Sequence, residues 1–140
     1  MLQLIYISTS RADITQPMLD DILAASRRNN AQAGITGLLL AGNRRFLQAL
    51  EGPDLAVLST LKRIGGDQRH FAIVELARRA ITAREFGNWQ MDFQRGTDAA
   101  AGAALRDSVE ALVSNLSNPN MRAQFTGFAA LHSRSHSRAA

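Results

Sequence analysis

Short apolar runs alternate with stretches of helical periodicity along the first 95 residues of the chain. Apolar or alternating runs predict strands at Leu2–Ser8, Ile35–Ala41, Arg45–Leu50, Phe71–Ala80 and Trp89–Arg95. Apolar residues spaced three and four apart predict helices from Thr15 to about Asn30 and from Pro53 to about Ile64. The resulting order, β-α-β-β-α-β-β, is that of an α+β, ferredoxin-like sheet with one extra strand and two helices on one face.

The segment Gly34–Gly52 is predicted to form a β-hairpin at the centre of this sheet. Gly42-Asn43 predicts its turn, because both residue types tolerate positive φ. The first strand is apolar almost throughout, which is typical of a strand covered on both faces. Side chains of the second strand alternate, so one face carries Phe46, Gln48 and Leu50 and the other carries Leu47, Ala49 and Glu51.

Each predicted helix has an apolar side that we expect to face the sheet. The first begins at the capping hydroxyl of Thr15, followed by Pro17, and its spacing places Asn30 on the inward side at the helix end. The second ends at Gly65-Gly66. The expected inward stripes are Leu19, Ile22, Leu23 and Ser26 in the first helix and Leu55, Leu58, Leu61 and Ile64 in the second.

The rest of the chain is expected to cover the second face of the sheet, toward which Ile5, Ile7 and Leu47 point. Ala99–Leu116 has the pattern of an amphipathic helix, and a second short helix is predicted from Asn120 to about Leu131. We therefore divide the chain into a core of residues 1–95, a helical cap of residues 96–131, and a polar tail of residues 132–140 that we expect to be disordered.

Composition and charge narrow the classes of function. The net charge of +4 comes with scattered arginine pairs rather than a basic block, so we do not expect a nucleic-acid partner. The absence of cysteine excludes disulfides, zinc–thiolate sites and thiol catalysis. No apolar run is long enough to span a bilayer and the first strand lacks the basic start of a signal peptide, so we predict a cytoplasmic protein.

Polar side chains on an apolar internal surface are the main candidates for chemistry. Tyr6 and Gln48 lie mid-strand on the face that the two helices cover, and Asn30 approaches the same face. Taken singly, Tyr6 fits a core tyrosine, Asn30 a helix C-cap, and Gln48 an exposed residue. Together they suit a flat heteroaromatic ligand with polar edges. The sequence has no hydrolytic or metal-binding motif, and a lone histidine, His70, is as consistent with structure as with chemistry.

The ordered set of motifs resembles the BLUF family of flavin-binding blue-light sensors over nearly all of residues 1–95. The motifs that carry the resemblance are LIYIS at Leu4–Ser8, SRRNN at Ser26–Asn30, GITGLLL at Gly34–Leu40, RFLQALEG at Arg45–Gly52, DQRH at Asp67–His70 and the W-x-M of Trp89 and Met91. The chain is similar to the short, stand-alone members, which have two extra helices on the far face of the sheet.

The resemblance implies a flavin, FAD with FMN or riboflavin as alternatives, between the two helices. It assigns light-driven electron and proton donation to Tyr6, and hydrogen-bond switching that gives a reversible red-shifted state to Gln48. It places Asn30 at the polar edge of the flavin ring, with Arg63, Asp67 and His70 nearby. It gives signal relay to Trp89 and Met91, and implies a non-enzymatic sensor that acts on a separate partner protein and forms a homo-oligomer.

Two other functions are compatible with a ferredoxin-like fold. A small acylphosphatase-like hydrolase would use an arginine after the first strand, for which Arg11 is the candidate, together with an asparagine. It would leave Tyr6 and Gln48 without a role, and the phosphate-binding loop is missing. An RNA-binding sheet would need exposed aromatic residues on adjacent strands, for which Phe46 and Tyr6 are the candidates.

Overall fold

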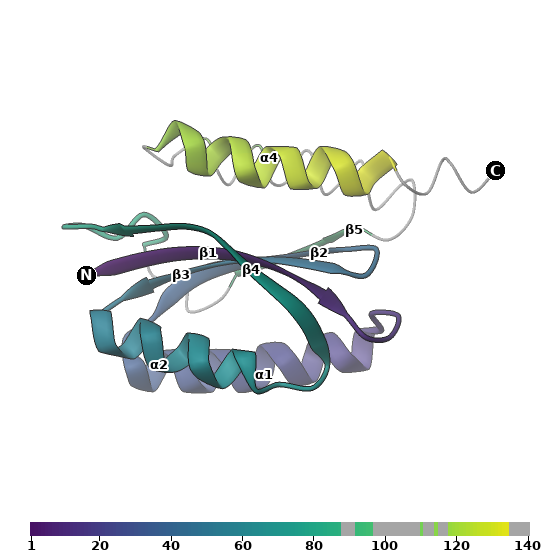
Figure 1. Ribbon diagram of the computed structural model, residues 1–140, viewed down its shortest axis with the longest axis horizontal. Helices are drawn as coiled ribbons and strands as arrows, with labels where there is room; N and C mark the ends of the chain where they lie inside the picture. Colours follow the sequence, from purple (N-terminus) through teal and green to yellow (C-terminus); the bar gives the residue numbers. More distant parts are fainter. Residues whose placement is uncertain (88–91, 97–109, 111–113, 115–117, 135–140) are drawn as a thin grey trace.

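The computed structural model describes residues 1–87, 92–96, 110, 114 and 118–134. Five strands and three helices follow one another along these residues (Figure 1). The elements are β1 (Leu2–Ser10), α1 (Gln16–Ala33), β2 (Thr36–Gly42), β3 (Arg45–Gly52), α2 (Asp54–Gly65), β4 (His70–Ala80), β5 (Asp92–Gly96) and α4 (Pro119–Arg134).

The strands form one sheet in the order β4-β1-β3-β2-β5. Strand β1 pairs antiparallel with both β3 and β4, and β2 pairs antiparallel with β3. The extra strand, β5, adds to the edge at β2 in parallel orientation. Helices α1 and α2 cover one face of the sheet and α4 covers the other (Figure 1). The predicted α+β architecture is confirmed, including the strand at Phe71–Ala80.

Two hydrophobic cores lie on either side of the sheet. The core under α1 and α2 takes Leu4 and Tyr6 from β1 and Phe46 and Leu50 from β3. The core under α4 takes the alternate residues of the same strands, with Ile5, Leu47 and Ala49 packed against Phe125 and its neighbours. The predicted alternation in β1 and β3 is therefore correct. Strand β2 is buried along its whole length, as expected for a strand covered on both faces.

The central hairpin turns one residue later than predicted. Gly42 still pairs with Arg45, so the two turn residues are Asn43 and Arg44. Asn43 has φ of +55°, a left-handed conformation that asparagine tolerates better than most residues. Asn43 is in the turn, as predicted, but Gly42 is the last paired residue of β2 and not the first residue of the turn.

The buried side of α2 differs from the predicted stripe. Leu55 is 80% exposed and Leu58 is 37% exposed, whereas Val57 and Thr60 are buried. Ala56, Leu61 and Ile64 pack partly against the core, so the inward face is centred on Val57. The error arises because a strict spacing of three drifts around a helix of 3.6 residues per turn. The correct face also contains a threonine and an alanine, which the apolar pattern passed over.

Helix α4 provides the cover expected for the second face. It continues to Arg134, three residues beyond the predicted end at Leu131. Met121, Phe125, Phe128 and Ala129 are buried against the sheet. Apart from residues 110 and 114, the predicted helix at Ala99–Leu116 lies outside the described residues, as do residues 135–140 of the tail. The division into core, cap and tail stays a prediction.

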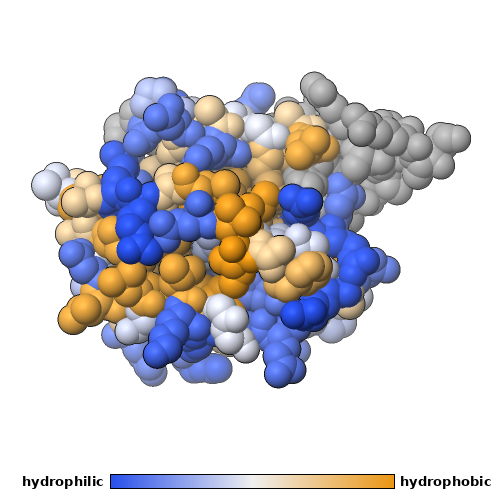
Figure 2. All heavy atoms as spheres, viewed as in Figure 1, coloured by the Kyte–Doolittle hydropathy of each residue, from blue (hydrophilic) through white to orange (hydrophobic). Residues whose placement is uncertain are grey.

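Strand β4 forms one edge of the sheet and keeps large hydrophobic side chains at the surface. Phe71, Val74 and Leu76 are 42%, 53% and 41% exposed. Hydrophobic residues gather on the face of the molecule that Figure 2 presents, where polar side chains interrupt them. An edge strand of this kind offers unpaired backbone groups beside apolar side chains, which is a surface suited to protein contacts.

Candidate functional site

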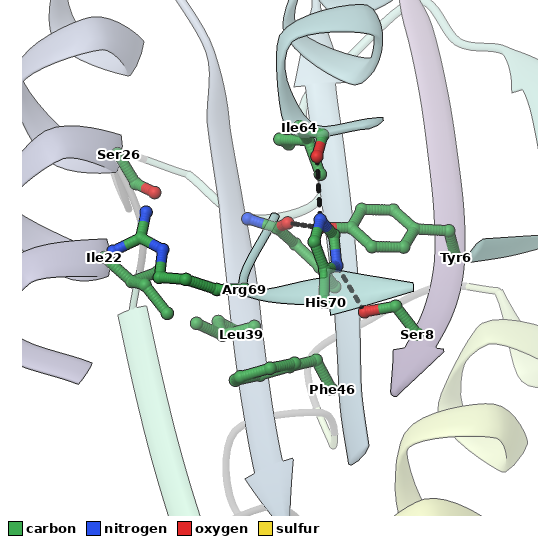
Figure 3. A pocket seen from close by; sticks show the side chains of 10 residues that line it. Tyr6, Ser8, Ile22, Ser26, Leu39, Phe46, Ile64, Arg69 and His70 are labelled. Atoms are coloured by element: carbon green, nitrogen blue, oxygen red, sulfur yellow. Dashed lines mark hydrogen bonds between the residues drawn. The ribbon is translucent and has the colours of Figure 1, made fainter. Parts of the chain in front are cut away.

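A cavity opens between α1, α2 and the sheet, on the face where the sequence predicted the candidate site. Its volume is about 50 Å³. An adjoining cavity of about 70 Å³ shares part of its lining, including Ile22, Gln48 and Arg69. The first is lined by Tyr6, Ser8, Ile22, Ser26, Leu39, Phe46, Gln48, Ile64, Arg69 and His70 (Figure 3). The second extends the site toward Asn29, Asn30, Thr60 and Arg63.

Tyr6 and Gln48 form the polar centre of the first cavity. They lie directly opposite each other in the β1–β3 ladder, and the phenol hydroxyl of Tyr6 donates a hydrogen bond to Oε1 of Gln48. Both side chains are almost completely buried. Burial, with a smaller contribution from the negative charge of Asp67, raises the pKa of the Tyr6 phenol far above its usual range. The phenol is therefore a neutral donor at physiological pH, aimed at an amide that can both accept and donate.

Asn30 lies one turn before the end of α1, with 1% of its surface exposed. The helix is capped by Gly34, which has φ of +72° and whose backbone N–H donates to the carbonyl of Asn30. The N–H of Ile35 donates to the same carbonyl at 2.9 Å. The interpretation of Asn30 as a C-cap is therefore wrong. Its side chain lines the second cavity instead.

His70 is the first residue of β4 and ties three elements together. Its Nε2 lies 2.7 Å from the carbonyl oxygen of Ile64 at the end of α2, and its Nδ1 lies 2.8 Å from Oγ of Ser8 on β1 (Figure 3). A carbonyl oxygen only accepts, so Nε2 must carry the proton, and in the neutral ring Nδ1 accepts from the Ser8 hydroxyl. The ring meets Phe46 edge to face. His70 thus fixes one wall of the cavity.

The remaining predicted contacts are divided between the cavity and its support. Arg63 lines the second cavity, whereas Asp67 lines neither. Asp67 instead binds the guanidinium of Arg69 through both carboxylate oxygens, with a closest contact of 2.6 Å from Nη2. Hydrogen bonds from Arg69 lower the pKa of the Asp67 carboxyl. Asp67 therefore acts on the site by holding Arg69.

Arg69 is the site residue that sequence reasoning missed. It lines both cavities, and Figure 3 shows its side chain extending across the opening toward Ser26 and Ile22. In the sequence it lies within the DQRH motif, between the expected site residues Asp67 and His70. Asp67, two residues before it in the sequence, could have indicated its role, because a carboxylate so near in the chain can hold the Arg69 guanidinium in one orientation.

Trp89 and Met91, the predicted relay residues, lie outside the described residues. Among the residues that the structure does describe, no group of three histidine, aspartate or glutamate side chains is placed to hold a metal ion. Within the same set, no helix combines the length and the apolar character that crossing a membrane requires.

The two alternative functions lose their basis in the structure. The guanidinium of Arg11 lies 5.0 Å above the ring of the exposed Phe71, and Arg11 lines neither of these cavities, so it is not part of the site that contains Asn30. Phe46 and Tyr6 are 5% and 3% exposed beneath the helices. They do not offer a surface on which RNA bases stack.

The donor set fits a flavin. A flat heteroaromatic ring needs apolar walls, which Ile22, Leu39 and Ile64 supply. Its carbonyl and ring-nitrogen edge needs donors and acceptors of the kind that an amide offers, and the cavities are lined by two amide residues, Gln48 on the sheet and Asn30 on α1. A polar or phosphorylated chain is suited by cations, and the second cavity is lined by two, Arg63 and Arg69.

Comparison with known proteins agrees with this fit. The family profile of BLUF, the sensors of blue light using FAD, matches residues 1–92. The blue light- and temperature-regulated antirepressor BluF of Escherichia coli K12 is 37% identical over 89 residues, which are 64% of this chain and 22% of that protein. Photoactivated adenylate cyclase subunit beta of Euglena gracilis is 30% identical over 82% of this chain and 14% of its own length. The chain thus spans less than a quarter of these relatives.

Solved structures match over more of the chain. The dark-state structure of BlrB, a BLUF protein, has a TM-score of 0.68 and 33% identity, and the match covers 93% of this chain and 96% of BlrB. BlrP1 of Klebsiella pneumoniae, solved with FMN and cyclic diGMP, has a TM-score of 0.76 and 29% identity over 93% of this chain and 35% of its own. With its matched core and a cavity suited to a flavin, the chain belongs to the BLUF family of flavin-binding blue-light sensors.

Proposed function

We propose that Tyr6 and Gln48 are the photochemical pair of this blue-light sensor. The observation that carries the proposal is the hydrogen bond from the Tyr6 phenol to Oε1 of Gln48 inside the cavity. It joins a neutral proton and electron donor to a side chain that can exchange its acceptor end for its donor end. A bound flavin supplies a strong oxidant when it absorbs blue light.

The two side chains carry out the proton chemistry. Loss of an electron makes the Tyr6 phenol a strong acid, and Gln48 Oε1 is the base in direct contact with it. When the electron and the proton return to Tyr6, the amide is left rotated or tautomerised, so the donors that Gln48 turns toward Tyr6 and toward the ligand are changed. A new donor at the polar edge of the ligand lowers the energy of its excited state, which is the expected origin of a red-shifted spectrum.

The other polar residues bind and orient. Asn30 is proposed to hold the polar edge of the flavin ring, and Arg63 and Arg69 to hold the chain attached to it. Asp67 positions Arg69, and His70 fixes the wall beside Tyr6 and Ser8. Trp89 and Met91 remain the proposed relay from Gln48 to the last strand, on the strength of the family resemblance.

The output is proposed to be a protein contact rather than catalysis by this chain. BLUF domains are sensors, and the names of the relatives include an antirepressor and adenylate cyclases. We propose that the signal passes to an effector protein in the cytoplasm and that the chain forms homo-oligomers. The exposed apolar side chains of β4 are the surface that favours such contacts.

Replacing Gln48 by leucine tests the proposed pair. Leucine keeps most of the volume and removes both amide groups, so flavin should still bind while the reversible red shift after blue light disappears. The control is Gln68→Leu, at an exposed position between α2 and β4, which should keep the wild-type light response. A Gln48→Leu protein that still gives the full red shift would show that the amide is not the switch.

A further inference from the structure

Glu51 is a fully buried carboxylate on the face of the sheet opposite the cavity. Its Oε1 accepts from the Thr36 hydroxyl at 2.9 Å and from the backbone N–H of Phe86 at 2.8 Å. Its Oε2 accepts from Nε2 of Gln3 at 3.2 Å and from the backbone N–H of Glu85 at 2.9 Å. Four donors around one carboxylate compensate for its loss of water.

The carboxylate joins the sheet to the segment that leads from β4 toward β5. Gln3 and Thr36 lie directly beside Glu51 on β1 and β2. Arg84 adds bonds from its guanidinium to the Thr36 hydroxyl at 2.9 Å and to the carbonyl of Gly34 at 2.7 Å. The segment Arg84–Phe86 is therefore held on β3 through Glu51 and on β2 through Arg84, by side chains rather than by a strand ladder.

The two ends of this connection are the photochemical pair and α4. Gln48 lies three residues before Glu51 on β3, with its side chain on the opposite face. Phe86, whose N–H the carboxylate holds, is 1% exposed, and its ring meets the ring of Phe125 on α4 at 6.2 Å in an edge arrangement. A shift of β3 at Gln48 can thus reach α4 through Glu51 and Phe86, beside the direct packing of Leu47 and Ala49 against the same helix.

We propose that Glu51 is a positioning residue that couples the photochemical pair to α4, by holding the Glu85–Phe86 backbone on β3. The inference rests on the proposed function, because it needs Gln48 to change when light is absorbed. A rigid connection transmits a displacement only if both of its ends move together. The Glu51 carboxylate provides such a rigid connection because it accepts from two consecutive backbone N–H groups, those of Glu85 and Phe86. Neither bond could be kept if the side chain rotated.

Glu51→Gln is the matched perturbation. A glutamine places an NH₂ group where one carboxylate oxygen stood, so it faces either the N–H of Glu85 or that of Phe86 and loses that bond. The test is hydrogen exchange of the amides of residues 119–134, measured in the dark and under blue light on the flavin-loaded full chain. Glu75→Gln is the control, because Glu75 is an exposed carboxylate that pairs with Arg78.

We expect Glu51→Gln to keep the dark exchange pattern and the flavin red shift, and to reduce the light-minus-dark difference in α4 about threefold or more. Glu75→Gln should match the wild type in all three. An unchanged α4 difference in Glu51→Gln, beside a normal red shift, would overturn the coupling and leave the proposed function intact. A wild-type protein with a red shift but no light-dependent exchange in α4 would do the same.

A second variant covers the case in which Glu51→Gln does not fold. Thr36→Val removes one of the four donors and leaves the backbone bonds to Glu85 and Phe86 in place. It should reduce the α4 response by a smaller factor, again with a normal red shift; a full wild-type response would overturn the inference. Loss of the red shift in the wild-type protein itself would instead overturn the proposed function.

Discussion

Tyr6 and Gln48 face each other across β1 and β3, and the phenol donates to the amide with both side chains almost completely buried. The pair occupies the polar centre of a cavity whose apolar walls come from Ile22, Leu39, Phe46 and Ile64. Two buried polar side chains of this kind would normally form hydrogen bonds only with each other. Here they also line a cavity suited to a flat ligand, so a change in either side chain alters the hydrogen bonds available to that ligand.

The raised pKa of Tyr6 predicts that this phenol resists ionisation in the folded protein. Tyr6 is the one tyrosine of the chain, so the tyrosinate absorption band reports on it alone. We expect no tyrosinate in the folded protein at pH values just above the ordinary pKa of 10.0, and ionisation near that value in denaturant. A folded protein in which Tyr6 ionises near pH 10 would contradict the burial of this phenol.

The same shift predicts how stability depends on pH at the alkaline end. Above pH 10.0 the unfolded chain loses the phenol proton while the folded chain keeps it, so the unfolded state binds fewer protons and the free energy of unfolding falls as pH rises. This contribution is fully present below that pH. Denaturant unfolding of the wild type and of Tyr6→Phe across this range should show a steeper decline for the wild type, and parallel curves would argue against it.

Asn30→Ala is expected to weaken flavin binding and leave the fold intact. The helix end does not depend on this side chain, since Gly34 caps it and the bonded group is the Asn30 carbonyl. Loss of one hydrogen bond to the ligand should lower affinity by roughly one to two powers of ten, measured by flavin fluorescence. Asn120→Ala, at an exposed position on α4, is the control, and equal affinities for the two variants would remove Asn30 from the site.

Two glycines with opposite surroundings give a matched test of the packing at the end of β3. A Cβ added to Gly52 would lie 2.7 Å from the carbonyl oxygen of Gly34, a backbone contact that cannot move aside cheaply. Gly52→Ala should therefore destabilise the protein by about 1–3 kcal/mol. A Cβ at Gly127, within α4, meets nothing within 4 Å, so Gly127→Ala should stabilise by about 0.5–1 kcal/mol. Denaturant midpoints of the two variants that move in the same direction would contradict this.

The sequence predicted the photochemical pair because strand alternation is a strong constraint. Placing Tyr6 on the helix-covered face of β1 and Gln48 on that of β3 required only the period of two and the hairpin between β2 and β3. The inward position of Asn30 followed from helical spacing, and the alternative in which it caps the helix is excluded because Gly34, four residues later, is the cap.

The parts that the sequence did not predict depend on three-dimensional contacts. The inward face of α2 includes Thr60 and excludes Leu55. Packing against the sheet determines which side of the helix faces inward, and that side does not carry all of its most apolar residues. Arg69 enters the site through its bond to Asp67. Glu51 was placed on the correct face of β3, but its four donors come from β1, β2 and the segment after β4, which no local pattern connects.

The most direct measurement is the absorption spectrum of flavin-loaded protein in the dark and after blue light, for the wild type and for Tyr6→Phe. Phenylalanine keeps the ring in the core and removes only the hydroxyl that donates to Gln48. We expect a reversible red shift in the wild type, and in Tyr6→Phe the same bound flavin without the shift. A normal light response in Tyr6→Phe would contradict the central role of the Tyr6–Gln48 hydrogen bond.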